Sequence, residues 1–269
     1  MSDSIFNLRK GRIPLVVSMP HIGLAIPSEI AQTMTAAAKP RDDTDWHLET
    51  LYDFLENLGA SLLTPVYSRY VVDLNRPPGG PTMYPGQDNT PVCPVDTFDR
   101  VPLYAAGRAP DASEIERRIQ TYWHPYHTAL ENELARVRQE HGVALLWDAH
   151  SVRSVVPRFF EGRLPDFNLG TVGGLSCGPG LGERLLDIAN ASGRYSSVLN
   201  GRFVGGFVTR SHGRPKSDIH AVQLELSQIT YMDESPPYAF DNQRAQQLRP
   251  LLRLLLEDVL AWAKTDRKQ

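Results

Sequence analysis

The stretch Val143-Ala144-Leu145-Leu146-Trp147-Asp148-Ala149-His150-Ser151 begins with five apolar residues and continues into polar ones. A continuous apolar run of this length is typical of a strand that is buried on both faces. Further apolar runs of strand length cover residues 15–19, 62–66, 70–74, 203–209 and 221–226. The sequence therefore predicts strands at these positions, with polar side chains where some of the strands end.

Segments with helical periodicity lie between several of these runs. Residues 46–58 carry apolar side chains three or four positions apart, and the glycine that follows is placed as a C-terminal cap. A second helix is predicted to begin at Ser113, because Ser113 and Glu116 match a capping box, and to continue to residue 137. Pro125 should kink this helix, because proline removes one backbone donor.

The remaining long segments complete the prediction of the fold. A last helix is predicted over residues 242–264, with a proline inside it. Residues 76–109 are rich in proline and glycine, and we expect an ordered loop in which Tyr84, Phe98 and Tyr104 are available for burial. Strands that alternate with helices predict an α/β fold whose largely parallel sheet is covered on both faces. Such folds carry their chemistry at the carboxyl ends of the strands.

The composition excludes one class of partner. The chain has 269 residues, with 28 Lys+Arg against 31 Asp+Glu and a formal net charge of −3. A broad basic face for nucleic acid would give a charge excess or a Lys/Arg block, and the sequence has neither. With 41% hydrophobic and 22% charged residues, the chain can bury a sizeable core as one large domain or two small ones.

Two further patterns concern location and metal chemistry. The most apolar stretch, residues 251–262, contains charged side chains and falls short of the roughly 20 apolar residues of a membrane span. The first twelve residues lack the apolar core of a secretory signal, so we expect a cytoplasmic protein. Cys93 and Cys177 are too few for a disulfide framework or a cysteine zinc site, and histidine and carboxylate groups would have to bind any metal ion.

Two of the predicted strands lead into a histidine. Residues 15–19 are followed by His21, and residues 143–147 are followed by Asp148 and His150. Two histidines at strand ends can converge on one metal ion, and a carboxylate two residues before His150 could orient its ring. The alternatives are a hydrogen-bonded loop residue at position 21, and a capping histidine beside a turn aspartate at position 150.

An aspartate cluster precedes the helix predicted over residues 46–58. Aspartate is a preferred N-cap and suits the positive end of the helix dipole, so Asp42, Asp43 and Asp45 have a purely structural interpretation. Three aspartates in four positions nevertheless exceed what one cap requires. One of them could supply the carboxylate of a site with two histidine ligands.

Glu225 interrupts the apolar pattern of residues 221–226. In a strand, Gln223 and Glu225 point the same way, so their face is either solvated or covered. On a covered face an ionised carboxylate is costly unless it is paired, bound to a metal ion or used as a base. Glu225 is therefore the best single candidate for a general base.

Arginines flank the run of residues 70–74. Arg76 beside Asn75 offers a planar fork and an amide, which suit the binding of a carboxylate, and Arg69 could polarise a carbonyl oxygen. The alternative is that both are surface arginines paired with the aspartate cluster. Five further residues could line the site or could simply cap, pack and pair: His124, His127, His212, Arg153 and Arg158.

Together these segments resemble the N-formylglutamate amidohydrolase (deformylase) family, which is related in fold and zinc chemistry to the zinc carboxypeptidases and aspartoacylases. The resemblance covers nearly the whole chain and implies one domain over residues 1–269, a three-layer α/β/α fold with a mixed, largely parallel central sheet similar to that of the zinc carboxypeptidases. Its specific stretches are Asp43-Thr44-Asp45-Trp46-His47, Ser68-Arg69, Asp73-Leu74-Asn75-Arg76-Pro77, His124-Pro125-Tyr126-His127, Leu146-Trp147-Asp148-Ala149-His150-Ser151, Gly162-Arg163-Leu164-Pro165-Asp166-Phe167-Asn168-Leu169-Gly170 and His220-Ala221-Val222-Gln223-Leu224-Glu225-Leu226.

The resemblance implies a set of metal ligands, with one departure from the related peptidases. His21 and His150 correspond to zinc ligands. The related peptidases take a carboxylate ligand from a His-x-x-Glu motif, whereas this chain has Leu24 three residues after His21. The third ligand must then come from elsewhere, and we choose Asp45 over Asp43.

The resemblance also implies a reaction, the hydrolysis of N-formyl-L-glutamate to L-glutamate and formate with Zn²⁺ or another divalent cation, as the last step of histidine degradation. Glu225 would be the general base and Arg69 would polarise the scissile carbonyl, while Asn75 and Arg76 would bind a carboxylate of this small-molecule substrate. The alternatives are a zinc deacylase of another N-acyl amino acid and a non-catalytic carboxylate-binding protein on the same scaffold. The sequence makes no prediction of the oligomeric state.

Overall fold

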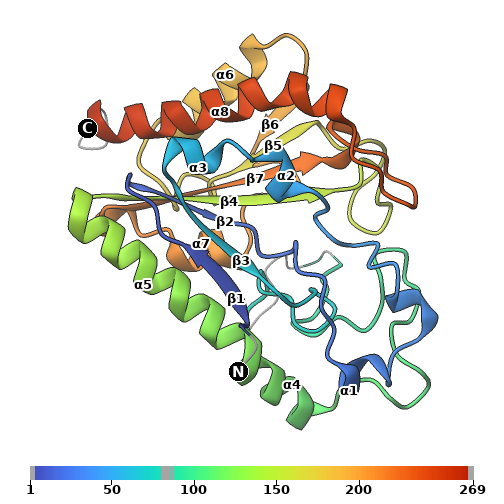
Figure 1. The fold of residues 1–269 in the computed structure, drawn as a ribbon. Coiled ribbons are helices and arrows are strands. Elements are labelled where there is room, and N and C mark those ends of the chain that lie inside the picture. Colours follow the sequence, from blue (N-terminus) through green and yellow to red (C-terminus); the bar gives the residue numbers. More distant parts are fainter. Residues whose placement is uncertain (1–3, 80–85, 87, 266–269) are drawn as a thin grey trace.

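The computed structural model describes residues 4–79, 86 and 88–265, and these residues build a mixed sheet of seven strands (Figure 1). The strand order is β1-β3-β2-β4-β7-β5-β6. The pairs β1/β3 and β5/β7 are antiparallel, and the other neighbouring pairs are parallel. The strands are β1 Phe6–Arg9, β2 Leu15–Ser18, β3 Ser61–Pro65, β4 Ala144–Val152, β5 Phe167–Gly170, β6 Ser197–Leu199 and β7 Ile219–Ser227.

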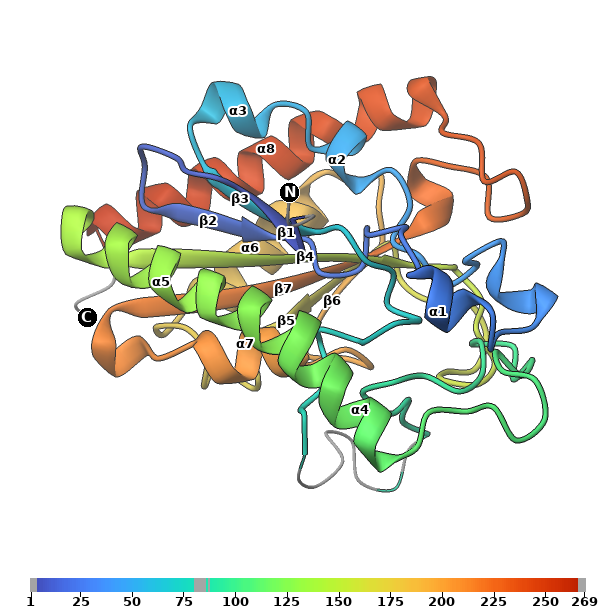
Figure 2. The same cartoon turned by 60° about the horizontal axis from the view of Figure 1, so that its bottom comes forward.

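Helices cover both faces of this sheet and make the three-layer α/β/α arrangement that we predicted (Figures 1 and 2). Helices α5 and α7 lie on one face, and α2, α3, α6 and α8 lie on the other. No helix of the described residues is long and apolar enough to cross a membrane. The helices are α1 Ser28–Ala31, α2 Leu48–Leu51, α3 Leu55–Leu58, α4 Ala112–Arg118, α5 His124–His141, α6 Leu181–Ala191, α7 Phe207–His212 and α8 Asn242–Thr265, with a π-helical turn at Ile119–Trp123.

The two central strands are buried on both faces. In β4, Leu145 and Trp147 pack into the core on the α8 side, whereas Ala144 and Leu146 pack into the core on the α5 side. Every residue of β4 and β7 is buried. Polar side chains near the carboxyl ends of these strands are therefore held in the interior, where they need partners.

Two of the predicted strands are wrong. Residues 70–74 form a buried turn after β3, in which the Val71 N–H donates to the carbonyl oxygen of Ser68 at 2.8 Å. Val71, Val72 and Leu74 pack into the core on the α5 side from a loop, so the burial of these residues gives the sequence a strand-like pattern without a strand. Residues 203–209 lead into α7, which begins after Gly205 with its left-handed φ of 126°.

The predicted helices are present with different boundaries. The helix predicted over residues 46–58 is two short helices, α2 and α3, and Gly59 ends α3 in the left-handed conformation as predicted. Helix α4 begins one residue before Ser113, and its N-cap is Asp111, whose carboxylate accepts from the Glu114 N–H at 2.9 Å. The predicted N-cap, Ser113, was therefore wrong: the observed N-cap, Asp111, lies two residues earlier.

Prolines occupy the predicted places in the long helices. Pro125 lies in the first turn of α5, directly after the π-helical turn, which is consistent with the missing N–H of proline. Helix α8 contains Pro250. In the loop of residues 76–109, Phe98 and Tyr104 are buried as expected, whereas Tyr84 lies outside the described residues.

Candidate functional site

Three segments that are far apart in sequence bring His21, Asp45 and His150 together. Strands β2 and β4 are parallel neighbours, with Ser18 opposite Asp148, so the segments that carry the two histidines reach the same edge of the sheet. Asp45 comes from the segment before α2, and its Oδ2 lies 3.6 Å from Nδ1 of His21 and 3.1 Å from Nδ1 of His150. All three side chains are buried.

These three side chains fit a divalent metal ion. One potential ligand atom from each residue lies within 4.8 Å of the others, and within the described residues they form the one such buried histidine and aspartate group. Two imidazole nitrogens and one carboxylate leave a position open for water or substrate, as catalytic zinc sites require. Asp45, rather than Asp43, is the aspartate that lies with the two histidines.

Two further aspartates orient the histidine rings. Nε2 of His21 lies 2.8 Å from Oδ1 of Asp73, and Nε2 of His150 lies 3.0 Å from Oδ1 of Asp148. A carboxylate accepts, so Nε2 of each ring can donate to its aspartate, and Nδ1 of each ring faces Asp45. This is the arrangement in which carboxylates fix metal-binding histidines.

Carboxylates dominate the charge around the two histidines. Burial opposes ionisation of Asp73, but Arg69 and His21 hold the pKa of Asp73 well below its usual range. Burial likewise opposes ionisation of Asp45, and the two histidines outweigh it, so the pKa of Asp45 is also lowered. A buried centre surrounded by ionised carboxylates favours a bound cation.

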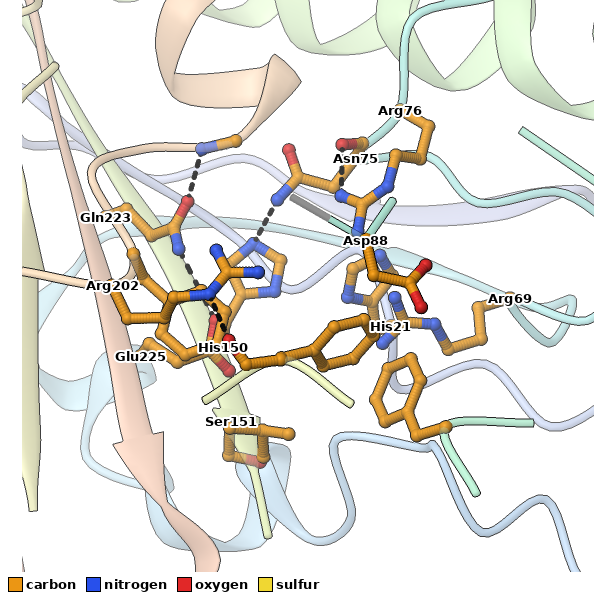
Figure 3. Close-up of a pocket in the computed structure, with 15 residues that line it drawn as sticks. His21, Arg69, Asn75, Arg76, Asp88, His150, Ser151, Arg202, Gln223 and Glu225 are labelled. Atoms are coloured by element: carbon orange, nitrogen blue, oxygen red, sulfur yellow. Dashed lines mark hydrogen bonds between the residues drawn. The ribbon is translucent and has the colours of Figure 1, made fainter. Parts of the chain in front are cut away.

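Glu225 lies on β7 directly opposite His150 on β4, and its side chain reaches the same cavity (Figure 3). Glu225 is 7% exposed, so the alternative that this face of the strand is solvated is wrong. Burial raises the pKa of Glu225 to about 8. Gln223 accepts from the Gly206 N–H at 2.6 Å and directs its Nε2 to Oε2 of Glu225 at 3.4 Å, which places an amide beside the carboxylate.

Arg69 is buried rather than on the surface, although it does pair with aspartates. Its Nη2 donates to Oδ2 of Asp73 at 2.6 Å, and its Nη1 lies 3.8 Å from Oδ1 of Asp45. The guanidinium carbon lies 4.8 Å from the centre of the Phe98 ring. Arg69 therefore lines the cavity while it connects the aspartate that orients His21 with the candidate metal ligand.

Asn75 and Arg76 approach the cavity from the loop after β3 (Figure 3). Oδ1 of Asn75 accepts from the Val208 N–H at 2.8 Å, which turns its Nδ2 toward Nε2 of His150 at 3.0 Å. The Nε of Arg76 donates to Thr90, and its Nη1 donates to the carbonyl oxygen of Asn75. These contacts fix both side chains at the cavity wall.

The cavity has a volume of about 550 Å³ including its open mouth. It combines the candidate histidine ligands and Glu225 with cationic, amide and aromatic groups, as Figure 3 shows. The lining residues are His21, Arg69, Asn75, Arg76, Asp88, Phe98, His150, Ser151, Val152, Phe159, Arg202, Phe203, Gly206, Gln223 and Glu225.

Several residues that the sequence singled out do not line this cavity. Asp43 accepts from the Phe98 N–H at 2.9 Å, and burial raises its pKa to about 6. Arg153 pairs with Asp99. His124 is exposed at the start of α5, where its ring packs against Trp123.

The other two histidines and Arg158 also have structural partners. His127 donates from Nε2 to the carbonyl oxygen of Leu74 at 2.8 Å, and its Nδ1 lies 3.1 Å from Nε2 of His212, whose ring stacks on it. Arg158 pairs with Asp88 and Asp96. The described contacts therefore assign these residues to packing and pairing around the site.

The sequence did not indicate a role for Asp73, Gln223 or Arg202. Gln223 and Arg202 line the cavity, and Asp73 supports His21 from behind. Asp73 lies two residues before Asn75 in a motif already singled out, and Gln223 shares a strand face with Glu225, so both had a signal. Arg202 had none, because only the tertiary structure brings its loop to the cavity.

A mixed sheet between two helical layers, with buried histidines, carboxylates and arginines around one cavity at the strand ends, suits an enzyme that acts on a small anionic molecule. Residues 13–232 match the family model of N-formylglutamate amidohydrolase. This match covers most of the chain, and the chain belongs to the N-formylglutamate amidohydrolase family.

Relatives with known names support this membership over the full length. The chain is 50% identical to an N-formylglutamate deformylase of Pseudomonas aeruginosa over 262 residues, which cover 97% of this chain and 98% of the relative. It is 46% identical to an N-formylglutamate deformylase of Pseudomonas putida over 260 residues, with 97% of each chain covered.

Solved structures share the fold. The crystal structure of an N-formylglutamate amidohydrolase from Ralstonia eutropha JMP134 superimposes with a TM-score of 0.79 at 25% identity, covering 98% of this chain and 99% of the other. A protein of Agrobacterium tumefaciens has a TM-score of 0.74 at 17% identity, over 97% and 96% of the two chains, which shows the fold alone.

Proposed function

We propose that this protein hydrolyses the formyl amide of N-formyl-L-glutamate to L-glutamate and formate. The observation that carries the proposal is the identity of 46–50%, over nearly the full length, to two relatives named N-formylglutamate deformylase. The cavity supports it, because His21, His150 and Glu225 line the same space as three arginines. An anionic amide substrate requires this combination of catalytic and cationic groups.

We also propose that His21, Asp45 and His150 hold a divalent cation, with Zn²⁺ as the expected ion. The convergence of two Nδ1 atoms and one carboxylate oxygen supports this ligand set. The aspartates behind the two Nε2 atoms support it independently, because they fix the tautomers that binding needs. When bound there, the cation supplies Lewis acidity to water and to the formyl carbonyl.

The residues around the ligands have separate tasks in this proposal. Glu225 takes the proton of the attacking water and returns it to the nitrogen of the leaving amine. The guanidinium of Arg69 faces the negative charge that develops on the formyl oxygen. Asn75 and Arg76 bind a carboxylate of the substrate, which orients the formyl group toward the ligand set.

Family membership also suggests a physiological setting. We propose that the reaction is the last step of histidine degradation and that it takes place in the cytoplasm. Cys93 and Cys177 are free and buried, as a protein of a reducing compartment allows. The proposed partner is the small-molecule substrate.

The test is a formate-release assay on the purified full-length chain, with Zn²⁺ added or removed by a chelator. We expect release from N-formyl-L-glutamate that stops with the chelator and returns with Zn²⁺. N-formyl-L-aspartate, followed by formate release, and N-acetyl-L-glutamate, followed by acetate release, are compared at equal concentration. Faster turnover of either one would replace the proposed substrate, and no release from any of the three would refute hydrolysis. Release that persists after complete removal of metal would refute the role of the cation.

A further inference from the structure

Asp45 differs from the two histidines in how the chain places it. His150 lies on β4, and the turn with His21 directly follows β2, whereas Asp45 lies in an irregular segment before α2. The Asp45 N–H donates to the carbonyl oxygen of His21 at 3.2 Å. The segment lies outside the strands of the sheet, so contacts from other parts of the chain have to fix its position.

Two buried side chains hold the main chain on either side of Asp45. Nε2 of Gln228 donates to the carbonyl oxygen of Thr44 at 2.9 Å. The hydroxyl of Tyr231 donates to the carbonyl oxygen of Trp46, also at 2.9 Å. Gln228 is 2% exposed and Tyr231 is fully buried, so water cannot readily replace either donor. The residues before and after the aspartate are therefore each fixed by one hydrogen bond.

Ser151 connects the same two side chains with the carboxylate itself. Its N–H donates at 3.2 Å to Oδ2 of Asp45, the oxygen that faces both histidines. Its Oγ lies 2.7 Å from the Tyr231 hydroxyl and 3.4 Å from Nε2 of Gln228. A peptide oxygen only accepts, so the phenol donates to Trp46 and can accept from the serine hydroxyl.

Both side chains follow the strand that carries the proposed general base. Glu225 lies on β7, Gln228 begins the short helical turn after this strand, and Tyr231 ends that turn. Ser151 and Glu225 both line the cavity (Figure 3). One segment of the chain therefore places the base and holds the aspartate, and a shift of this segment would move both.

We propose that Tyr231 and Gln228 are positioning residues that keep the carboxylate of Asp45 directed at the shared centre of the two histidines. The inference rests on the proposed metal ligand set. Neither of these described side chains lines the cavity. Their loss should lower the affinity for the cation, because a ligand that is not held in place has to be ordered on binding. A merely structural role would lower the free energy of unfolding and leave the affinity of the folded chain unchanged.

The first measurement is competition for Zn²⁺ between a chelator of known affinity and the full-length chain or its variants Tyr231→Phe and Gln228→Met. Tyr126→Phe is the matched control. The buried hydroxyl of Tyr126 also lies against a serine hydroxyl, that of Ser18 at 3.0 Å, and a carbonyl oxygen, that of Leu63 at 3.4 Å. Tyr126 lies on α5 and does not line the cavity. Thermal unfolding of each metal-free protein verifies that it folds.

We expect Tyr231→Phe and Gln228→Met each to weaken Zn²⁺ binding by about 3- to 10-fold, the range for loss of one hydrogen bond between neutral groups. Tyr126→Phe should bind Zn²⁺ within about twofold of the unmodified chain. If one of the two variants does not fold, the other decides. An affinity within about twofold of the unmodified chain in Tyr231→Phe, or an equal loss in Tyr126→Phe, would overturn the proposal.

A second comparison tests whether the effect acts through Asp45. In Asp45→Ala the carboxylate is gone, so the addition of Tyr231→Phe should weaken Zn²⁺ binding by less than about twofold. If Tyr231→Phe causes the same loss with and without the carboxylate, Tyr231 acts on another part of the site and the proposal is wrong.

The binding measurements also separate this inference from the proposed function. If Tyr231→Phe weakens Zn²⁺ binding but the unmodified chain releases no formate, the function fails and the positioning role stands. If formate is released but Tyr231→Phe and Gln228→Met bind Zn²⁺ as the unmodified chain does, the positioning role fails and the function stands. A full-length chain that binds no Zn²⁺ would overturn the ligand set and this inference, whatever the formate assay shows.

Discussion

The substitution Asp148→Asn tests whether the two buried histidines are metal ligands held by carboxylates. Asp148 is fully buried; its Oδ1 lies 3.0 Å from Nε2 of His150, and its Oδ2 accepts from the Thr209 hydroxyl at 2.9 Å. Asparagine has nearly the same shape. Its oxygen can accept from His150 while its amide donates to Thr209, because a hydroxyl also accepts. The substitution therefore removes one charge and keeps the hydrogen-bonding pattern.

The magnitude follows from the kind of hydrogen bond that is lost. A hydrogen bond to an ionised acceptor is roughly twice as strong as one between neutral groups. Removal of such a partner behind a metal-binding histidine typically costs about 10- to 100-fold in metal affinity, or about 1.4–2.7 kcal/mol. We expect Zn²⁺ affinity of Asp148→Asn to fall within this range, because Asp45 and His21 still supply two of the three proposed ligands.

The assay is competition for Zn²⁺ against a chelator of known affinity, with zinc measured by elemental analysis. Asp258→Asn is the control, since Asp258 pairs with Arg184 on the helical layer formed by α6 and α8. Thermal unfolding without metal separates a loss of affinity from a loss of fold. A Zn²⁺ affinity of Asp148→Asn within twofold of the unmodified chain would refute the assignment of His150 as a carboxylate-oriented ligand.

Two further predictions concern the proton chemistry of the protein. Glu225→Gln should retain bound Zn²⁺ but lose at least about 100-fold in kcat, because general base catalysis contributes that much. Glu257→Gln, at an exposed position of α8, is the control, and a kcat within tenfold of the unmodified chain would remove Glu225 as the base. The second prediction is a loss of stability in acid from the buried histidine pair. Burial lowers the pKa of His127 to about 3 and that of His212 to about 4, so the unfolded chain takes up protons below pH 6.5 that the folded chain does not. The free energy of unfolding should therefore fall as the pH is lowered, by about 2 kcal/mol per histidine at pH 5. In urea unfolding, His212→Gln should lose less stability between pH 7 and pH 5 than the unmodified chain. An identical loss in the two proteins would contradict this origin of the acid sensitivity.

The central strands could be predicted because their apolar runs are long enough to identify them. Strands β2, β4 and β7 lie in the middle of the sheet, where helices cover both faces, so nearly every residue is apolar until the polar ends. Those polar ends include His150 and Glu225. They could be recognised because a polar side chain inside a buried strand is costly unless it is paired or has a function. The same logic led to the best-defined part of the site.

The outer strands could not be predicted because their pattern depends on their neighbours. Strand β1 is half-buried, β6 has only three residues, and β5 mixes polar and apolar side chains. Such short strands are stable only when paired, and propensity at an edge is weak evidence. The opposite error occurred at residues 70–74, which are buried but form a turn.

The difference between strand and loop residues has a functional consequence. His150 and Glu225 are fixed by backbone pairing on β4 and β7, where a shift of one residue would turn both side chains to the other face of the sheet. Arg76 and Arg202 instead come from loops, and Arg202 is placed by a carbonyl oxygen 43 residues away in sequence. Loops tolerate substitution better than central strands. Changes in the amino acid that is accepted should therefore arise in these loops, while the chemistry at the strand ends stays the same.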